Sequence, residues 1–154
     1  MARKIVICLD GTNNQYEAAN TNVVKLYAML DRDSNDQIAY YQPGIGTMAP
    51  QGLWGRFHRW FATRLDLAIA WLLQDHVTSA YRFLMRYYEA GDEIYIFGFS
   101  RGAYTARVLA AMLYKVGLLG KGNEELIEFA WSIFKRKYGD DILQKDFATP
   151  LVER

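Results

Sequence analysis

Cysteine is nearly absent from this chain of 154 residues. The single one, Cys8, lies in the apolar run at residues 5–9. One cysteine cannot close an internal disulfide, so nothing in the composition indicates an oxidising compartment. Because burial in a strand raises a thiol pKa, Cys8 is a poor candidate for a nucleophile, and we interpret it as structural.

Long apolar runs and an excess of one charge are also missing. The first apolar run ends at Asp10, which is too short for a secretory signal or a membrane span. We therefore expect a cytoplasmic protein, with signal-less export left open. The 18 basic and 17 acidic residues give a net charge of +1. Binding of nucleic acid is not predicted, because the basic triplet at 135–137 fits a solvated helix end.

The residues that are present favour a packed α/β domain. Hydrophobic residues make up 51% of the chain and aromatic residues 15%, enough for one domain with a core. Apolar runs and turn signals predict strands at 4–9, 37–42 and 93–97. Helices are predicted from 21 or 22 to 30, over 57–88 with a break, from 100 or 101 to 115, and over 123–138. Strands that alternate with helices predict a mainly parallel sheet covered by helices.

One motif carries chemistry, the sequence Gly98-Phe99-Ser100-Arg101-Gly102. It follows a predicted strand and opens a helix of small residues, which is the arrangement of a nucleophile elbow. A sharp turn there would present the serine hydroxyl at the carboxyl edge of the sheet, and glycine at both flanks avoids collisions. We predict Ser100 as nucleophile and the Arg101 N–H as an oxyanion donor. The alternative is an ordinary turn with an incidental serine.

A second oxyanion donor is expected from the loop after the first strand. In Asp10-Gly11-Thr12, glycine permits a close backbone approach, and the N–H of Gly11 or of Thr12 is the candidate. The alternative is a strand-ending turn in which Asp10 bonds its own backbone.

Two known motifs, one of phosphatases and one of dinucleotide-binding proteins, are matched only in part by this sequence. Phosphatases of the haloacid-dehalogenase type have Asp-x-Asp-Gly-Thr after their first strand, but Cys8 stands where their nucleophilic Asp would be. The stretch Gly-x-Gly-x-x-Ala at 44–49 matches a dinucleotide fingerprint. It follows Pro43 without opening a capped helix, so we interpret it as a loop.

An aromatic and basic segment leads into the long predicted helix and forms its first turns. As a lid or lipid-facing helix it would provide a peripheral membrane contact; the alternative is a helix packed in the core. Its aromatic residues are Trp54, Phe57, Trp60 and Phe61.

The base that a nucleophilic serine needs is missing from its expected place. In α/β-hydrolases the order is Ser, then Asp or Glu, then His, whereas His58 and His76 both precede Ser100. We interpret His76 as a helix-surface or cap residue and His58 as part of the aromatic segment. We therefore expect residues 1–154 to form a single partial domain, the N-terminal nucleophile half, without the triad acid and histidine.

Five segments occur together in an order that resembles a known family. That family is a largely uncharacterised α/β-hydrolase domain of fungi and bacteria, related to the phospholipase (Tle-type) effectors of type VI secretion. The resemblance implies a three-layer α/β-hydrolase fold with Ser100 as nucleophile, and an acid and histidine further along than residue 154. The segments are LDGTN at 9–13, TNVVKLY at 21–27, YYQPGIGT at 40–47, AYRFL at 80–84 and GDEIYIFGFSRGAYTAR at 91–107.

The functional hypothesis is a serine hydrolase for carboxylic esters or phospholipid acyl esters, needing no metal or organic cofactor. The alternative is a truncated or degenerate hydrolase fold that acts as a non-catalytic binding module. The sequence predicts no oligomeric state.

Overall fold

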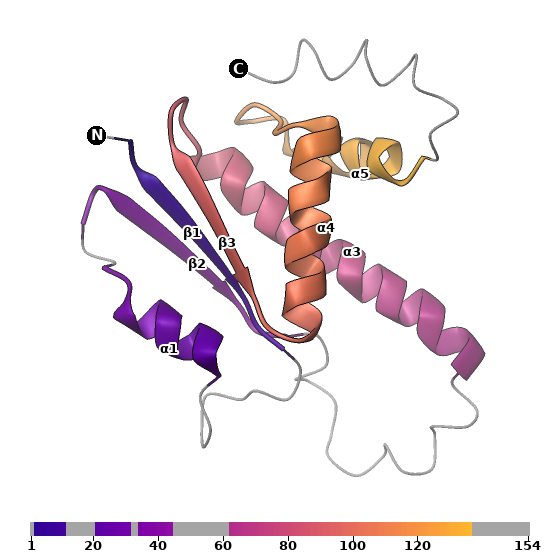
Figure 1. Ribbon diagram of the computed structural model, residues 1–154. Coiled ribbons are helices and arrows are strands. Elements are labelled where there is room, and N and C mark those ends of the chain that lie inside the picture. The colour runs from indigo at the N-terminus through magenta and orange to yellow at the C-terminus, as the bar shows by residue number, and fades with distance from the viewer. Residues whose placement is uncertain (1, 12–20, 32–33, 45–61, 137–154) are drawn as a thin grey trace.

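The computed structural model describes residues 2–11, 21–31, 34–44 and 62–136, with side chains from residue 72 onward in the last range. Three strands alternate with helices along the chain (Figure 1). The elements are β1 (Lys4–Leu9), α1 (Asn22–Met29), β2 (Gln37–Gln42), α3 (Ala62–Tyr87), β3 (Glu93–Gly98), α4 (Arg101–Val116), the 3₁₀ turn η1 (Glu124–Leu126) and α5 (Ile127–Lys135).

The three strands form a parallel sheet in the order β2-β1-β3. Lys4 pairs with both Gln37 and Glu93, and Leu9 pairs with both Gln42 and Gly98. The strands therefore end together at one carboxyl edge, at the bottom of Figure 1. Central β1 is a continuous apolar run because helices cover both of its faces.

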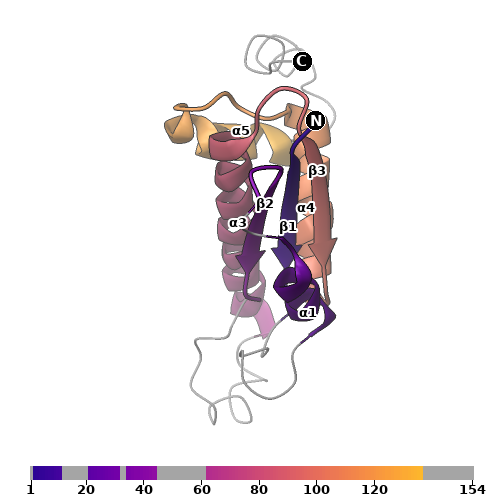
Figure 2. The same ribbon diagram turned by 90° about the vertical axis from the view of Figure 1, so that its left-hand side faces the viewer.

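Helices pack on both faces of the sheet (Figure 2). Ile5, Ile7 and Leu9 point into a core shared with α3, α4 and α5. The alternate residues Val6 and Cys8 pack beneath α1 on the opposite face. The two-residue period of a strand thus divides β1 between two apolar layers. The fold is α/β, as the sequence predicts.

A buried tyrosine joins α3 to the segment after α4. The hydroxyl of Tyr81 donates to the Gly117 carbonyl and accepts from the Leu119 N–H, each at 2.9 Å. Burial raises the pKa of Tyr81 to about 12, although the Leu119 hydrogen bond opposes that shift. The phenol therefore acts as a neutral cross-link between helices.

Two details differ from the sequence prediction. In the described part of the helix predicted over 57–88, residues 62–87 form one helix of 26 residues without a break, because they contain no glycine or proline; residues 57–61 lie outside the described residues. The helix predicted over 123–138, with Leu126 on its inward face, is α-helical only from Ile127, and Leu126 is 37% exposed, whereas Trp131 is buried. The reason is that Leu126 lies in η1, where a 3₁₀ turn breaks the angular spacing of the following helix. Within the described part of the chain, no helix is long and apolar enough to cross a membrane.

Cys8 yields a first testable prediction. It is fully buried, and burial, with the charge of Asp10 as a smaller cause, raises its pKa from the ordinary 9.0 to about 11. At about pH 8 the thiolate fraction is then roughly a hundredfold lower in the folded than in the unfolded protein, because two pKa units are a factor of 100. An aromatic disulfide reagent should thus react at least about a hundredfold faster after unfolding in guanidinium. Equal rates would contradict this burial.

Candidate active site

The candidate site is the turn between β3 and α4. Strand β3 ends at Gly98 and α4 begins at Arg101, with Ser100 between them at φ 53° and ψ −122°. Ser100 is the one residue other than glycine with a positive φ in the described part of the chain. Its side chain is exposed at the carboxyl edge of the sheet. Such a conformation costs about 1–3 kcal/mol and persists only where the surroundings enforce it.

Two glycines provide the room for this turn. A Cβ on Gly98 would lie 2.5 Å from the Gly102 carbonyl oxygen. A Cβ on Gly102 would lie 2.2 Å from the Leu9 oxygen and 2.5 Å from the Asp10 oxygen. Gly98 thus lets β3 approach the first turn of α4, and Gly102 lets α4 rest on the end of β1.

Backbone hydrogen bonds hold the turn on three sides. The Phe99 N–H donates to the Leu9 carbonyl at 3.1 Å, and the Gly102 N–H donates to the Phe99 carbonyl at 2.9 Å. The Ala103 N–H donates to the Ser100 carbonyl at 3.0 Å. The Arg101 N–H has no acceptor among the residues that the structure describes, as is usual at the start of a helix. This N–H lies next to Ser100 at the positive end of the α4 dipole.

The loop after β1 lies against the Ser100 turn. A Cβ on Gly11 would be 3.0 Å from the Ser100 Cβ and 3.2 Å from the Phe99 ring. The Gly11 N–H donates to the Asp10 carboxylate at 2.7 Å. The two alternatives considered from the sequence therefore occur together. Gly11 comes close to Ser100, and the Asp10 carboxylate accepts a hydrogen bond from the backbone next to it. Thr12 lies outside the described residues.

The Asp10 carboxylate also accepts hydrogen bonds from hydroxyl groups at this edge of the sheet. Its side chain is buried, and its Oδ2 accepts from the Thr21 hydroxyl at 2.8 Å and the Tyr41 hydroxyl at 2.9 Å. Sequence analysis did not identify Thr21 or Tyr41 as part of the site. The available signal was their position, since each lies near the carboxyl edge, at the start of α1 and near the end of β2.

Comparison with known proteins identifies the family. Residues 3–150 match the model of the type VI secretion (T6SS) phospholipase effector Tle1-like catalytic domain. The chain belongs to this family. It is also 42% identical over 158 aligned residues to the uncharacterized protein YEL023C of Saccharomyces cerevisiae (strain ATCC 204508 / S288c). That alignment covers 98% of this chain and 23% of the yeast protein, so the chain spans about a quarter of its curated relative. No solved structure matches the chain.

The described part of this Tle1-like catalytic domain brings no base to Ser100. Within it, the Ser100 hydroxyl has no hydrogen-bond partner. His76 lies half-buried in the middle of α3, where burial lowers its pKa and nearby Asp75 opposes that shift. His58 is outside the described residues, as are residues 45–49 of the glycine-rich stretch and the aromatic residues Trp54, Phe57, Trp60 and Phe61.

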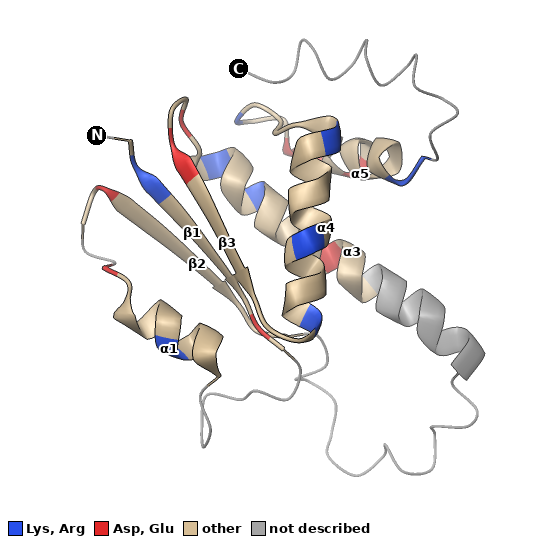
Figure 3. Ribbon diagram, viewed as in Figure 1, with Lys and Arg blue, Asp and Glu red and all other residues tan. Residues whose placement is uncertain are grey.

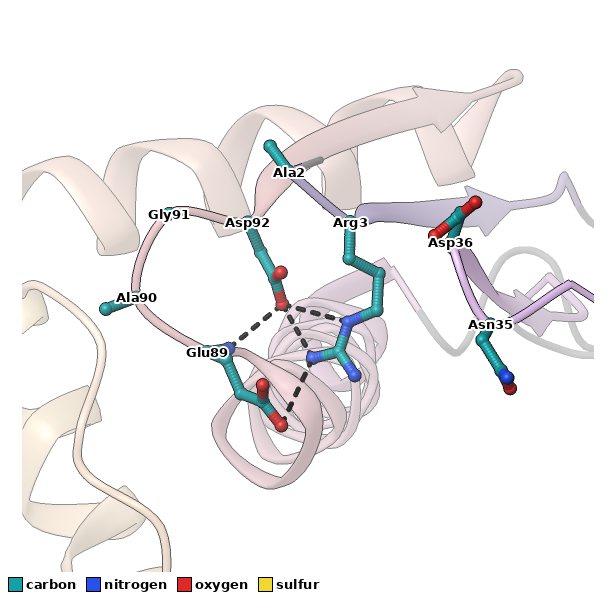
Figure 4. Close-up of a pocket in the computed structure, with 8 residues that line it drawn as sticks. All are labelled: Ala2, Arg3, Asn35, Asp36, Glu89, Ala90, Gly91 and Asp92. Carbon is teal, nitrogen blue, oxygen red and sulfur yellow. Dashed lines mark hydrogen bonds and ion pairs between the residues drawn. The ribbon is translucent and has the colours of Figure 1, made fainter.

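A hollow in this Tle1-like domain lies where the strands begin, away from Ser100 (Figure 4). The Arg3 guanidinium pairs with Asp92 at 2.7 Å and also donates to the Tyr87 carbonyl. Burial alone would raise the pKa of Asp92, but hydrogen bonds from Arg3 and the Glu89 N–H hold it below its ordinary value. The Arg3 and Asp92 side chains neutralise each other and link the start of β1 to the α3–β3 connection. We therefore interpret the residues around the hollow as having a structural role. Over the described ranges, no cluster of His, Cys, Asp and Glu could hold a metal.

Proposed function

We propose that the chain is the nucleophile-bearing part of a serine hydrolase for carboxylic esters, with phospholipid acyl esters as its preferred substrates. The observation that carries the proposal is Ser100, exposed at the N-terminus of α4 in a strained backbone conformation between Gly98 and Gly102. Strain of this kind is retained where function needs it. Membership of a phospholipase effector family supports the same chemistry.

In the proposed reaction, Ser100 Oγ attacks the ester carbonyl carbon, and the carbonyl electron pair moves onto oxygen. The Arg101 N–H donates to this oxyanion. For the second donor, Thr12 suits the role better than Gly11, because the Gly11 N–H already donates to Asp10. A histidine accepts the Ser100 proton and gives it to the departing alcohol, and water then releases the acid from the acyl-enzyme.

We propose that this histidine and the acid that orients it come from polypeptide outside residues 1–154, so that the chain is a partial domain. Among the described residues β3 pairs with β1 alone, which leaves β3 at the edge of the sheet. Tyr95 and Phe97 of β3 lie on the same face of the sheet as Val6 and Cys8 of β1. Helix α1 covers this face over β1, but Tyr95 and Phe97 are 41% and 40% exposed. Parallel sheets are normally covered on both faces. The greater length of the yeast relative fits a sheet that continues beyond β3.

The surroundings of Ser100 suit an amphiphilic substrate. Phe99 and Tyr104 are 49% and 58% exposed next to the serine, and offer apolar surface for an acyl chain. Helix α4 carries Arg101 and Arg107 in its first two turns and no acidic residue along its length, as Figure 3 shows. Cations on this helix suit a phosphate head group.

We also propose that the aromatic segment before α3 makes a peripheral membrane contact, which would bring Ser100 to its lipid substrate. The cytoplasmic location and this contact are predictions from sequence. The residues concerned are Trp54, Phe57, Trp60 and Phe61.

A fluorophosphonate probe tests the proposal on the full-length protein, which would supply the histidine and the acid, because the probe forms a covalent adduct with an activated serine. Mass spectrometry of the digested protein should locate the adduct on Ser100, with Ser34 and Ser132 as internal controls. Phospholipid vesicles should release fatty acid in parallel. Wild-type protein with neither adduct nor fatty acid would instead support the non-catalytic binding module, which the lack of a base among the described residues favours.

A further inference from the structure

We propose that Asp10 is a positioning residue that holds Gly11 against the Ser100 turn and so keeps the nucleophile in its reactive position. This inference rests on the proposed hydrolase function. It assigns Asp10, Thr21 and Tyr41, here called the Asp10 cluster, a role in catalysis without contact to substrate.

The buried Asp10 carboxylate accepts hydrogen bonds on both of its oxygens, and these bonds hold it in place. It is 2% exposed, and burying a charge is costly unless hydrogen bonds compensate it. Oδ1 accepts from the Gly11 N–H at 2.7 Å, while Oδ2 accepts from the hydroxyls of Thr21 at 2.8 Å and Tyr41 at 2.9 Å. Hydrogen bonds to a charged acceptor are stronger than neutral ones, so this carboxylate fixes the direction of the backbone that follows it.

The partners of Asp10 are themselves held by regular elements. The Thr21 oxygen accepts from the Val24 N–H at 3.2 Å as the N-cap of α1 while its hydroxyl donates to Asp10. The Tyr41 ring packs on Tyr27 of α1, with centroids 5.3 Å apart. The Asp10 cluster thus fixes the loop after β1 relative to α1 and β2.

The loop has little room to move relative to Ser100. An added Cβ on Gly11 would lie 3.0 Å from the Ser100 Cβ, and one on Gly102 would lie 2.5 Å from the Asp10 carbonyl oxygen. A catalytic group acts only when it is held within about 0.5 Å of its productive position. Loss of an Asp10 partner should therefore slow the chemical step more than it weakens substrate binding.

Two matched tyrosine variants test this inference. Tyr41→Phe and Tyr81→Phe each remove one hydrogen-bonded hydroxyl and keep the ring, but Tyr81 lies between α3 and the segment after α4. We expect Tyr41→Phe to lower kcat about tenfold, with KM changed less than about twofold. Tyr81→Phe should lower the Tm and leave kcat unchanged well below it. An unchanged kcat in Tyr41→Phe, or equal losses in both variants, would overturn the inference.

Thr21 provides a rescue experiment. Thr21→Val removes the hydroxyl and should lower kcat, whereas Thr21→Ser keeps the hydroxyl and should retain at least about half of the wild-type value. If both variants lose kcat equally, the hydroxyl is not the operative group and the positioning role is wrong.

Hydrogen exchange separates this inference from the proposed function. In Tyr41→Phe, and not in Tyr81→Phe, a peptide containing Gly11 should exchange its amide hydrogens at least about threefold faster than in wild type. Unchanged exchange overturns the restraint even if the enzyme is active. Equal ester turnover by wild type and Ser100→Ala overturns the proposed function and, with it, the catalytic role of Asp10, whatever the exchange shows.

Discussion

Replacement of Ser100 by alanine is expected to lower fatty-acid release from phospholipid vesicles by at least about a thousandfold. Without Oγ no acyl-enzyme can form, and only the oxyanion donors and substrate binding would remain. Because the side chain is exposed and makes no hydrogen bond to the described residues, the fold should be retained. Initial rates, with circular dichroism to check folding, measure the effect. Residual activity near the wild-type rate would assign the nucleophile to another residue.

Ser100→Gly is the matched variant for the strain at this position. Glycine adopts φ 53° without a steric penalty, so relief of strain should outweigh the entropy lost on ordering glycine. We expect the free energy of unfolding to rise by about 1 kcal/mol in Ser100→Gly relative to Ser100→Ala, while both are inactive. Urea titration distinguishes them. If the glycine variant were the less stable of the two, the backbone at Ser100 would not be strained.

The second large effect is expected at Gly102, where alanine should lower the free energy of unfolding by about 3–5 kcal/mol. A Cβ there would lie 2.2 Å from the Leu9 oxygen, and its nearest neighbours are all backbone atoms. Leu9 cannot yield, because it ends the central strand and pairs with both Gln42 and Gly98. Helix α4 would have to move away from β1, which should also displace Ser100.

Gly120→Ala is the control for this substitution. A Cβ on Gly120 would meet only the Asn123 side-chain nitrogen at 3.6 Å, an ordinary contact. Its free energy of unfolding should therefore stay within about 0.5 kcal/mol of wild type. Thermal and urea denaturation of both variants give the comparison. Similar stabilities would mean that α4 does not rest on the end of β1.

Together, these two effects separate the structural from the chemical requirements of the turn. Gly98 and Gly102 are needed because backbone atoms occupy the space of a side chain. Ser100 has no such steric reason, since its conformation would suit glycine better. A serine in a position that favours glycine is therefore best explained by its hydroxyl.

The sequence by itself determined the local structure of the protein. The apolar run at residues 5–9 and the turn-forming residues after it predict a strand at 4–9, and the structure has β1 at Lys4–Leu9. Likewise, a strand followed by Gly-x-Ser-x-Gly and small residues predicts the start of α4 to within one residue. These features could be predicted because they depend on side-chain period and turn chemistry, which act between residues close together in the chain.

Only the tertiary structure decided which distant residues meet. It placed Gly11 against Ser100, and it brought Thr21 and Tyr41 to the Asp10 carboxylate across 11 and 31 residues of chain. No local pattern encodes these meetings, because they follow from strand order and register, with β1 between β2 and β3. Packing of the whole sheet and its helices sets that order, so the environment of the candidate nucleophile became visible only in three dimensions.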